Sequence, residues 1–300
     1  MLKIAFDPLY IHPVPLGHRF PMLKYELIPE QLVYEGTVVS SSFFRPREID
    51  EYYIKLAHRD TYWEKLKNLS LSTKEERRTG FSLSERLISR ELRIAQGTIE
   101  CCIYALQDGI AFNVAGGTHH AGSDWGEGFC LLNDQAIGAH YLLAQKKVEK
   151  ILIIDLDVHQ GNGTAEIFQN EQRVFTFSMH CQRNFPFRKE RSDLDIGLPE
   201  GLADEAYLTI LKRNLATLFS QVKPDFVFYL AGVDVLETDK LGRLCLSKQG
   251  CKMRDEIVFE HCKRFGVPVQ VSMGGGYSVQ IKDIVDAHCN TFKAAISRLC

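Results

Sequence analysis

The chain has 300 residues, 45% of them hydrophobic, and its formal net charge at pH 7 is -2. This apolar content suffices for one large core, and the near-neutral charge gives no indication of a nucleic-acid or membrane-surface partner. The N-terminus lacks the sustained apolar stretch of a signal peptide, and no window approaches the roughly 18 apolar residues of a spanning helix. We therefore expect a cytoplasmic protein.

Apolar runs rich in β-branched and aromatic residues predict strands that are buried on both faces. They lie at 3–7, 110–116, 150–157, 174–180, 225–232 and 267–276. Helical patterns alternate with them at 84–107, 134–146, 204–222, 250–265 and 279–299, with Gly109, Pro224 and Gly266 as stop signals. This alternation predicts an α/β fold whose parallel sheet carries helices on both faces.

The stretch at 69–85 resembles a linker but is too short to mark a domain boundary, so we expect one domain over residues 1–300. The nine cysteines are odd in number and include no C-x-x-C motif. Four of them, Cys101, Cys102, Cys262 and Cys289, lie among apolar residues in helix-like stretches. We predict that these four are reduced thiols of the core.

Polar and glycine residues gather directly after the predicted strands. The segments are "GGTHHAG" after residue 115, "DLDVHQGNG" after 154, "SMHC" after 177, "AGVDV" after 230 and "MGGGY" after 272. In a parallel sheet, ligand sites form beyond the carboxyl ends of the strands. These segments therefore predict a single functional rim.

Asp155, Asp157 and His159 point to one side of an extended backbone, because side chains alternate with period 2. Asp234 follows another buried run and belongs to the same rim. The set Asp157, His159 and Asp234 suits zinc with open positions for water and substrate. Two alternatives stay open: plain solvated or capping groups, and a dinucleotide turn, which Glu166 at the third glycine position disfavours.

Two adjacent histidines, His119 and His120, follow a predicted strand and are flanked by glycines. Burying two imidazoles there would be costly unless they had a functional role. They are candidates for proton transfer beside a metal, with Asp155 and Asn162 available to fix their tautomers. Tyr277 follows three glycines and is a candidate donor to an oxyanion, although it could also be an aromatic cap on the core. Together these residues predict metal-assisted hydrolysis of an amide or ester.

With these residues in place, the sequence resembles the histone deacetylase superfamily, which includes acetylpolyamine amidohydrolases. The resemblance runs from about residue 12 to the end. The motifs are "GHRFPM" (17–22), "HRDTYWEKL" (58–66), "AQGTIECC" (95–102), "GGTHHAGSDWGEGFCLLND" (116–134), "DLDVHQGNGT" (155–164), "AGVDVLETDKLG" (231–242) and "MGGGY" (273–277). The resemblance implies an arginase/deacetylase three-layer fold with a central, mainly parallel, eight-stranded sheet.

The resemblance also implies roles for individual residues. Zinc is expected on Asp157, His159 and Asp234, with His119 and His120 as the catalytic pair and Tyr277 polarising the carbonyl. The implied acyl-lysine tunnel contains Gly128, Phe129, Phe185 and Gly275. A potassium ion is implied behind the zinc, on main-chain oxygens around Asp155, Asp157 and His159 together with Ser178.

One departure from the family concerns the motif "HQGNG", where many relatives carry "HHGDG". The partner of His120 is then Asn162 rather than an aspartate, a feature similar to class IV histone deacetylases. Because an amide lends less electrostatic support than a carboxylate, we expect His120 to be the less basic histidine.

The leading hypothesis is a zinc-dependent deacylase of N-acyl-lysine or a related acylated amine. An acetylpolyamine amidohydrolase is the alternative, and it would need acidic residues at the tunnel mouth, for which Asp124, Glu127 and Glu237 are candidates. A silent binding module should have lost a ligand or the tyrosine, and this chain retains all of them. A dinuclear manganese hydrolase would want additional bridging aspartates. The acyl group, the choice of zinc over iron and the oligomeric state stay open.

Overall fold

The computed structural model describes residues 2–299, and its strands form one eight-stranded sheet in which every pair is parallel. Across the sheet the order is β2-β1-β3-β8-β7-β4-β5-β6. The strands are β1 (Lys3–Ala5), β2 (Phe43–Phe44), β3 (Ile110–Asn113), β4 (Ile151–Asp155), β5 (Val174–Cys181), β6 (Leu194–Leu198), β7 (Phe226–Leu230) and β8 (Val269–Ser272). The predicted parallel sheet is therefore confirmed.

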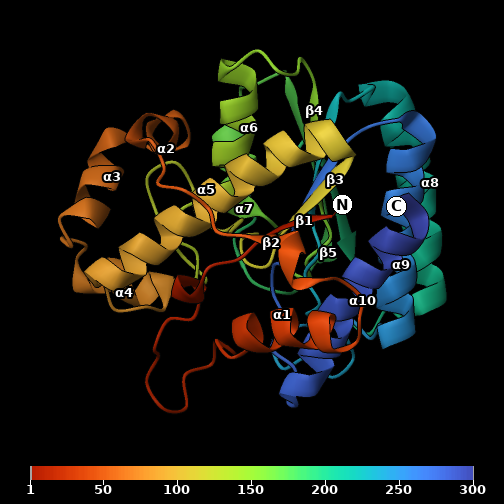
Figure 1. Ribbon diagram of the computed structural model, residues 1–300, viewed down its shortest axis with the longest axis horizontal. Helices are drawn as coiled ribbons and strands as arrows, with labels where there is room; N and C mark the ends of the chain where they lie inside the picture. The colour runs from red at the N-terminus through yellow and green to blue at the C-terminus, as the bar shows by residue number, and fades with distance from the viewer. Residues whose placement is uncertain (1, 300) are drawn as a thin grey trace.

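Helices cover both faces of this sheet (Figure 1). They are α1 (Lys24–Tyr34), α2 (Glu51–Ala57), α3 (Asp60–Lys67), α4 (Thr73–Thr79), α5 (Glu85–Asp108), α6 (Asp134–Ala144), α7 (Asn162–Phe168), α8 (Asp204–Val222), α9 (Lys248–Phe265) and α10 (Ile281–Leu299), with short 3-10 turns at Pro8–Tyr10 and Ser40–Ser42. In Figure 1, α8, α9, α10 and α1 lie on one side of the molecule, and α2 to α6 lie on the other.

The six predicted strands all form, because each run is apolar enough to be buried on both faces. In β4 and β7 every residue is buried. The sequence missed β2 and β6, which lie at the two edges of the sheet. β2 has only two residues, and in β6 four of the five residues keep some exposure, so neither carries the pattern of a central strand.

The five predicted helices also form, and their ends match their capping residues. Ser84 caps the start of α5, and Gly109 ends it in the left-handed region with φ 88°. The linker-like stretch at 69–85 contains α4, which begins with a capping box between Ser72 and Glu75. Short helices such as α2, α3, α4 and α7 were missed, because seven or eight residues give little periodicity to detect.

The register of the four central strands aligns their carboxyl ends. Asp155 of β4 pairs with Leu230 of β7, Leu230 pairs with Ser272 of β8, and Ser272 pairs with Asn113 of β3. The segments that follow these four residues therefore leave the sheet side by side. They are the segments that carry the predicted metal ligands, the histidine pair and Tyr277.

Among residues 2–299 all eight cysteines are free, and Cys101, Cys102, Cys262 and Cys289 are buried as predicted. Their surroundings are apolar, and burial raises the pKa of each of these four thiols. Within the same residues, no helix combines the length and the apolar character that crossing a membrane requires.

Candidate active site

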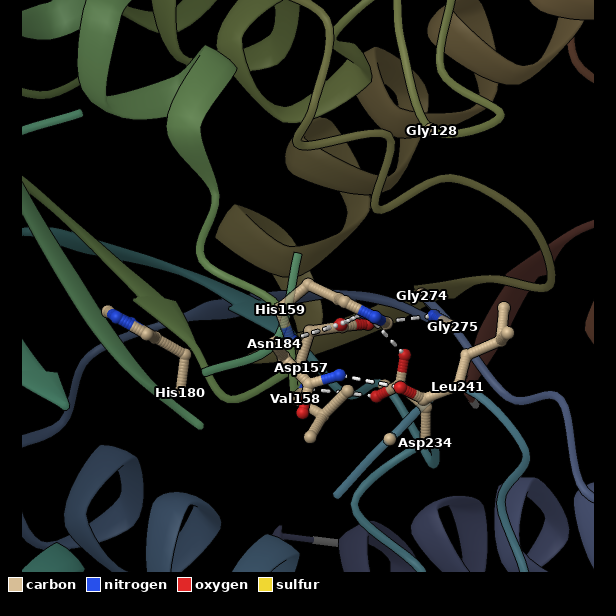
Figure 2. A network of polar contacts seen from close by, with 12 residues as sticks. Gly128, Asp157, Val158, His159, His180, Asn184, Asp234, Leu241, Gly274 and Gly275 are labelled. Atoms are coloured by element: carbon tan, nitrogen blue, oxygen red, sulfur yellow. Dashed lines mark hydrogen bonds and ion pairs between the residues drawn. The ribbon is translucent and has the colours of Figure 1, made fainter. Parts of the chain in front are cut away.

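Asp157, His159 and Asp234 meet beyond the carboxyl ends of β4 and β7 (Figure 2). One potential ligand atom of each lies within 4.8 Å of the others, and all three residues are buried. The Nδ1 atom of His159 is 2.9 Å from Asp157 Oδ1 and 3.1 Å from Asp234 Oδ2. Atoms bound at about 2.0–2.2 Å to one tetrahedral ion lie roughly 3.3–3.6 Å apart. The observed spacing is therefore close to that of a zinc site.

Main-chain amides hold the two carboxylates in place. The N–H of Val158 donates to Asp234 Oδ1 at 2.9 Å, and the N–H of Gly275 donates to Asp157 Oδ2 at 3.0 Å. A Cβ atom at Gly275 would lie 2.1 Å from Asp234 Oδ2. Gly275, predicted as part of the tunnel, therefore also packs directly against the candidate ligands, and no larger residue fits there.

The charges of this cluster favour a cation. Burial lowers the pKa of His159, but its hydrogen bonds to Asp157 and Asp234 outweigh burial and raise that pKa to about 10. Burial and the neighbouring charge of Asp157 raise the pKa of Asp234 to about 7. Two buried carboxylates this close together require a positive charge between them, which a metal ion would supply more fully than an imidazolium.

The two adjacent histidines have different partners. His119 Nδ1 lies 2.7 Å from Asp155 Oδ2, and His120 Nδ1 lies 2.7 Å from Asn162 Oδ1. Burial lowers the pKa of His119, but the charges of Asp155 and Asp157 outweigh it and raise that pKa. Burial and the neighbouring His119 lower the pKa of His120 well below its usual value. His120 is thus the less basic of the two, as its amide partner predicts.

Glu127 continues the contacts of Asn162. The Asn162 Nδ2 group donates to Glu127 Oε1 at 2.5 Å, and Arg78 Nε donates to Glu127 Oε2 at 2.7 Å. Only 7% of Glu127 is exposed, so its carboxylate faces the interior and not the mouth of a tunnel. The prediction of Glu127 as an acidic mouth residue is therefore wrong. Its partner lies 35 residues away in the chain, so sequence alone gave no signal of the pairing.

Tyr277 stands at the end of the glycine run. Gly274 has φ 66° and Gly276 has φ 156°, a backbone that L side chains rarely adopt. The N–H of Tyr277 donates to Asp239 Oδ2 at 2.6 Å, which fixes the start of the side chain. Burial, followed by the charges of Asp234 and Asp157, raises the pKa of the phenol well above its usual value. Tyr277 therefore keeps its proton and can donate a hydrogen bond at neutral pH.

A narrow inner cavity of about 40 Å³ joins these groups. Its lining includes the three candidate ligands, both histidines and four predicted tunnel or oxyanion residues, namely Gly128, Phe129, Gly275 and Tyr277. An outer cavity of about 370 Å³ shares His120, Gly128, Phe129, His159 and Tyr277 with it and adds Phe185. The two cavities are therefore contiguous, with the candidate ligands at the inner end.

Aromatic rings form the walls where the two cavities meet. The rings of Phe129 and Tyr277 are 5.9 Å apart, and the ring of Phe185 is 5.0 Å from that of His120. Gly128 lies between these walls with φ 57°, and a Cβ atom there would come within 2.7 Å of the His120 ring. The four residues predicted for the tunnel thus all lie along one passage.

Three other predicted residues line neither cavity. Asp124 pairs with Arg59 at 3.3 Å, and neither Asp124 nor Glu237 lines the inner or the outer cavity. Ser178, predicted to help bind potassium, is buried on β5 beside Asp155. Its hydroxyl lies 3.0 Å from the Nδ1 atom of His180.

The model of the histone deacetylase domain matches residues 18–292, which is most of the chain. The protein belongs to the histone deacetylase family. An uncharacterized protein of Picosynechococcus is 44% identical over 292 residues, covering 97% of both chains. Histone deacetylase 2 of Arabidopsis thaliana is 28% identical over 269 residues, covering 87% of this chain and 70% of its own. The crystal structure of an HDAC homologue from Aquifex aeolicus superimposes with a TM-score of 0.85 at 23% identity, covering 98% of this chain and 84% of that one.

At family level, this histone deacetylase relative is a hydrolase of the deacetylase type. Its architecture is the arginase/deacetylase fold of the HDAC structures, as the sequence motifs implied. The sheet is parallel throughout residues 2–299, where the resemblance implied a mainly parallel one.

Two buried basic residues of this deacetylase support the site without any signal in the sequence. Lys24 Nζ donates to the carbonyl oxygen of Gly274 at 2.8 Å, and burial lowers the pKa of Lys24 to about 8. Arg254 donates to the carbonyl oxygens of Leu156 and Gly232, and so joins the loops that follow β4 and β7. Lysine and arginine on amphipathic helices are ordinarily exposed, so only the tertiary structure identifies these two.

Proposed function

We propose that this protein is a zinc-dependent deacylase that removes the acyl group from N-acyl-lysine or a related acylated amine. One observation carries the proposal: a buried Asp157, His159 and Asp234 cluster lies at the inner end of an aromatic-walled passage, beside two histidines and a phenol. Hydrolysis of an unactivated amide needs an electrophile, a proton acceptor, a proton donor and an oxyanion donor. The chain provides candidates for each in one cavity.

The donor set fits zinc. Two carboxylates and one imidazole supply three protein ligands, which is the pattern of catalytic zinc sites with an open position. Zinc bound there would acidify a water ligand and polarise the acyl carbonyl. Potassium behind the zinc belongs to the same proposal, with Ser178 as its side-chain ligand.

His119 and His120 would transfer the protons. In each ring Nδ1 is engaged by Asp155 or Asn162, so Nε2 is the nitrogen left for the reaction. The Nε2 atom of His119 already points toward the candidate ligands, 3.9 Å from Asp157 Oδ1. Asp155 holds His119 in orientation and stabilises its protonated form.

Tyr277 would stabilise the oxyanion. Its phenol keeps its proton because burial raises its pKa, and it lines the same inner cavity as the histidines. A hydroxyl donor there strengthens its hydrogen bond as negative charge develops on the acyl oxygen. Phe129 and Phe185 would hold the straight apolar part of the substrate between their rings.

Acetylpolyamine hydrolysis is the second candidate within the same fold. It would need acidic side chains to hold a cationic substrate, and no Asp or Glu of the described chain lines the outer cavity. This observation favours acyl-lysine, or another substrate without added positive charge, over a polyamine.

The proposal can be tested on the purified protein with an acetyl-lysine peptide. We expect deacetylation that is lost after chelation and restored by zinc, with about one zinc per chain by elemental analysis. His261 is a half-buried histidine of α9 that lines neither cavity. The variant His261→Asn therefore controls for zinc bound by histidines outside the site, and its zinc content should equal that of the unmodified protein. Zinc-loaded protein that hydrolyses neither acyl-lysine peptides nor acetylated polyamines would overturn the proposal.

A further inference from the structure

The outer cavity has a basic rim, which we define as Arg19, Arg77, Arg78, Arg183 and Arg243. These five arginines come from four separate parts of the chain: the loop before α1, helix α4, the loop that follows β5 and the segment that follows β7. All five are exposed. Because the whole chain has a net charge of -2, this rim is a local concentration of positive charge and not a general property of the surface.

Most of the positive charge on this rim is uncompensated. Arg78 pairs with Glu127 and Arg243 pairs with Glu200. Within residues 2–299, Arg19, Arg77 and Arg183 have no ion pair. The nearby carboxylate of Asp239 accepts from the main-chain amides of Leu241, Gly242 and Tyr277, so it is already engaged.

The loop that carries Arg183 is fixed in place. Asn184 donates to the carbonyl oxygen of Leu241 and accepts from the N–H of Arg243, which ties this loop to the segment after β7. Lys189 donates to the carbonyl oxygens of Asn184 and Pro186. Phe187 of the same loop is 88% exposed and lines the outer cavity. The rim therefore presents guanidinium groups beside an aromatic surface.

We propose that this rim selects acylated amines that carry carboxylate groups next to the amine, and so disfavours cationic substrates. This inference rests on the proposed deacylase function. Guanidinium groups bind carboxylates through paired hydrogen bonds, whereas they repel ammonium groups. The carboxylates could belong to Asp and Glu residues that flank an acyl-lysine in a peptide, or to a small acylated amino acid.

The expected preference follows from the three uncompensated arginines. An exposed guanidinium–carboxylate pair contributes modestly, so two or three pairs together should favour an acidic substrate over a neutral one by about 5- to 30-fold. A basic substrate should be poorer than the neutral one. The preference should reside in kcat/KM at low substrate, and 0.5 M salt should reduce it to about twofold or less, because exposed charges are screened.

The experiment compares kcat/KM of the zinc-loaded protein on three acetyl-lysine peptides of equal length, flanked by Asp/Glu, by Ser/Gln or by Lys/Arg. A second arm compares Nα-blocked Nε-acetyl-lysine with its carboxamide, which separates a small acid from an acidic peptide. The test variant is Arg77→Gln/Arg183→Gln. The matched control, Lys212→Gln/Arg213→Gln, removes the same charge from exposed positions on α8 that line neither cavity.

We expect the wild type and the control to prefer the acidic peptide, and the test variant to lose most of that preference while its rate on the neutral peptide stays within about twofold. Equal rates on all three peptides, or a preference for the basic one, would overturn the inference. Binding of a ketone analogue, in which CH2 replaces the amide N–H, separates the two proposals. If no peptide is hydrolysed but the acidic analogue still binds better, the deacylase proposal fails and the rim assignment stands.

Discussion

The contact between Asn162 and Glu127 predicts how substitution of Asn162, which stands where many relatives carry an aspartate, changes the stability of the fold. Asn162 donates to Glu127 Oε1 at 2.5 Å and accepts from His120, and both Asn162 and Glu127 are buried. Asn162→Asp keeps the shape of the side chain but places two carboxylates in contact. We expect this single substitution to destabilise the fold, whereas Asn162→Asp combined with Glu127→Gln should restore most of the stability.

The magnitude follows from the 2.5 Å separation. Two charges at that distance repel by about 6–7 kcal/mol at an effective dielectric constant of 20. Protonating one carboxyl with an ordinary pKa near 3.9 costs about 4 kcal/mol at pH 7, so the pair would take up a proton instead. The resulting hydrogen bond offsets about 1 kcal/mol. The single variant should therefore lose about 3 kcal/mol, or roughly 5–10 °C in Tm.

The double variant reverses the polarity of the contact without leaving a polar group unpaired. The new amide at position 127 would accept from Arg78 and donate to the new carboxylate at position 162, which still accepts from His120. Glu127→Gln alone should cost about 1–2 kcal/mol, because Arg78 or Asn162 then loses an acceptor. The two substitutions should thus show a favourable coupling of about 2–3 kcal/mol in a double-mutant cycle.

Urea unfolding of all four proteins, with chelator present so that bound metal adds nothing, measures this coupling. In the folded Asn162→Asp variant, the carboxyl groups at positions 162 and 127 share a proton that the unfolded chain does not bind at pH 7. The stability of this variant relative to wild type should therefore rise as the pH falls toward 4. The matched control is Asn68→Asp, where an asparagine donates to Glu64 on an exposed surface, and it should change stability by less than about 1 kcal/mol. Additivity of the two substitutions within about 0.5 kcal/mol would refute the reasoning.

Three further predictions test other parts of the site and its support. Asp234→Ala should abolish both zinc binding and activity, as elemental analysis and rates would show; full zinc content in this variant would remove Asp234 from the ligand set. Tyr277→Phe should lower kcat by about 10²–10³ with zinc retained, and a rate within twofold of wild type would reduce Tyr277 to a packing residue. Burial lowers the pKa of His58 to about 4. As the pH falls below about 6.5, the unfolded chain therefore binds a proton that the folded chain does not. Up to about 3 kcal/mol of stability is lost in this way as the pH falls to 4. His58→Asn should remove this difference of about one bound proton between the unfolded and folded states, and so reduce the slope of the unfolding free energy against pH between pH 4.5 and 6. An unchanged slope would contradict the neutral state of His58.

The contact of Glu127 also changes what Asn162→Asp alone can reveal about catalysis. By itself, a carboxylate at position 162 would make His120 more basic and so move the acidic limb of the kcat/KM profile to higher pH. In the structure, that carboxylate would share a proton with Glu127, so its charge would be largely neutralised. Only the double variant places an unshared charge beside His120, and it is the variant whose pH profile should shift.

Local sequence pattern predicted the central strands and the residues that gather beyond their carboxyl ends. Every residue of β7 is apolar and buried, and β4 is apolar up to Asp155, so these runs predict strands from local pattern alone. In β8 the apolar residues Val269 and Val271 alternate with the buried polar residues Gln270 and Ser272. The period of an extended backbone predicted that Asp157 and His159 project together. They do meet, although residues 157–159 form a bend beyond the end of β4. Residues that directly follow parallel strands share one edge of the sheet, and this rule predicted that the segments with the histidine pair, Asp234 and Tyr277 would gather there.

The contacts among these groups, and the residues that surround them, follow from the way the fold joins distant segments. The order β3-β8-β7-β4 places Gly275 against Asp157 and Asp234, although the three residues come from three different segments. The sequence suggested Glu127 as an acidic residue of the tunnel mouth, but it is buried, with its carboxylate paired to Asn162 and Arg78 from elsewhere in the chain. The basic rim likewise assembles from segments that show no pattern in common. Local periodicity reports how a segment lies against the core, whereas hydrogen-bond partners and neighbouring charges depend on which distant segments the fold brings together.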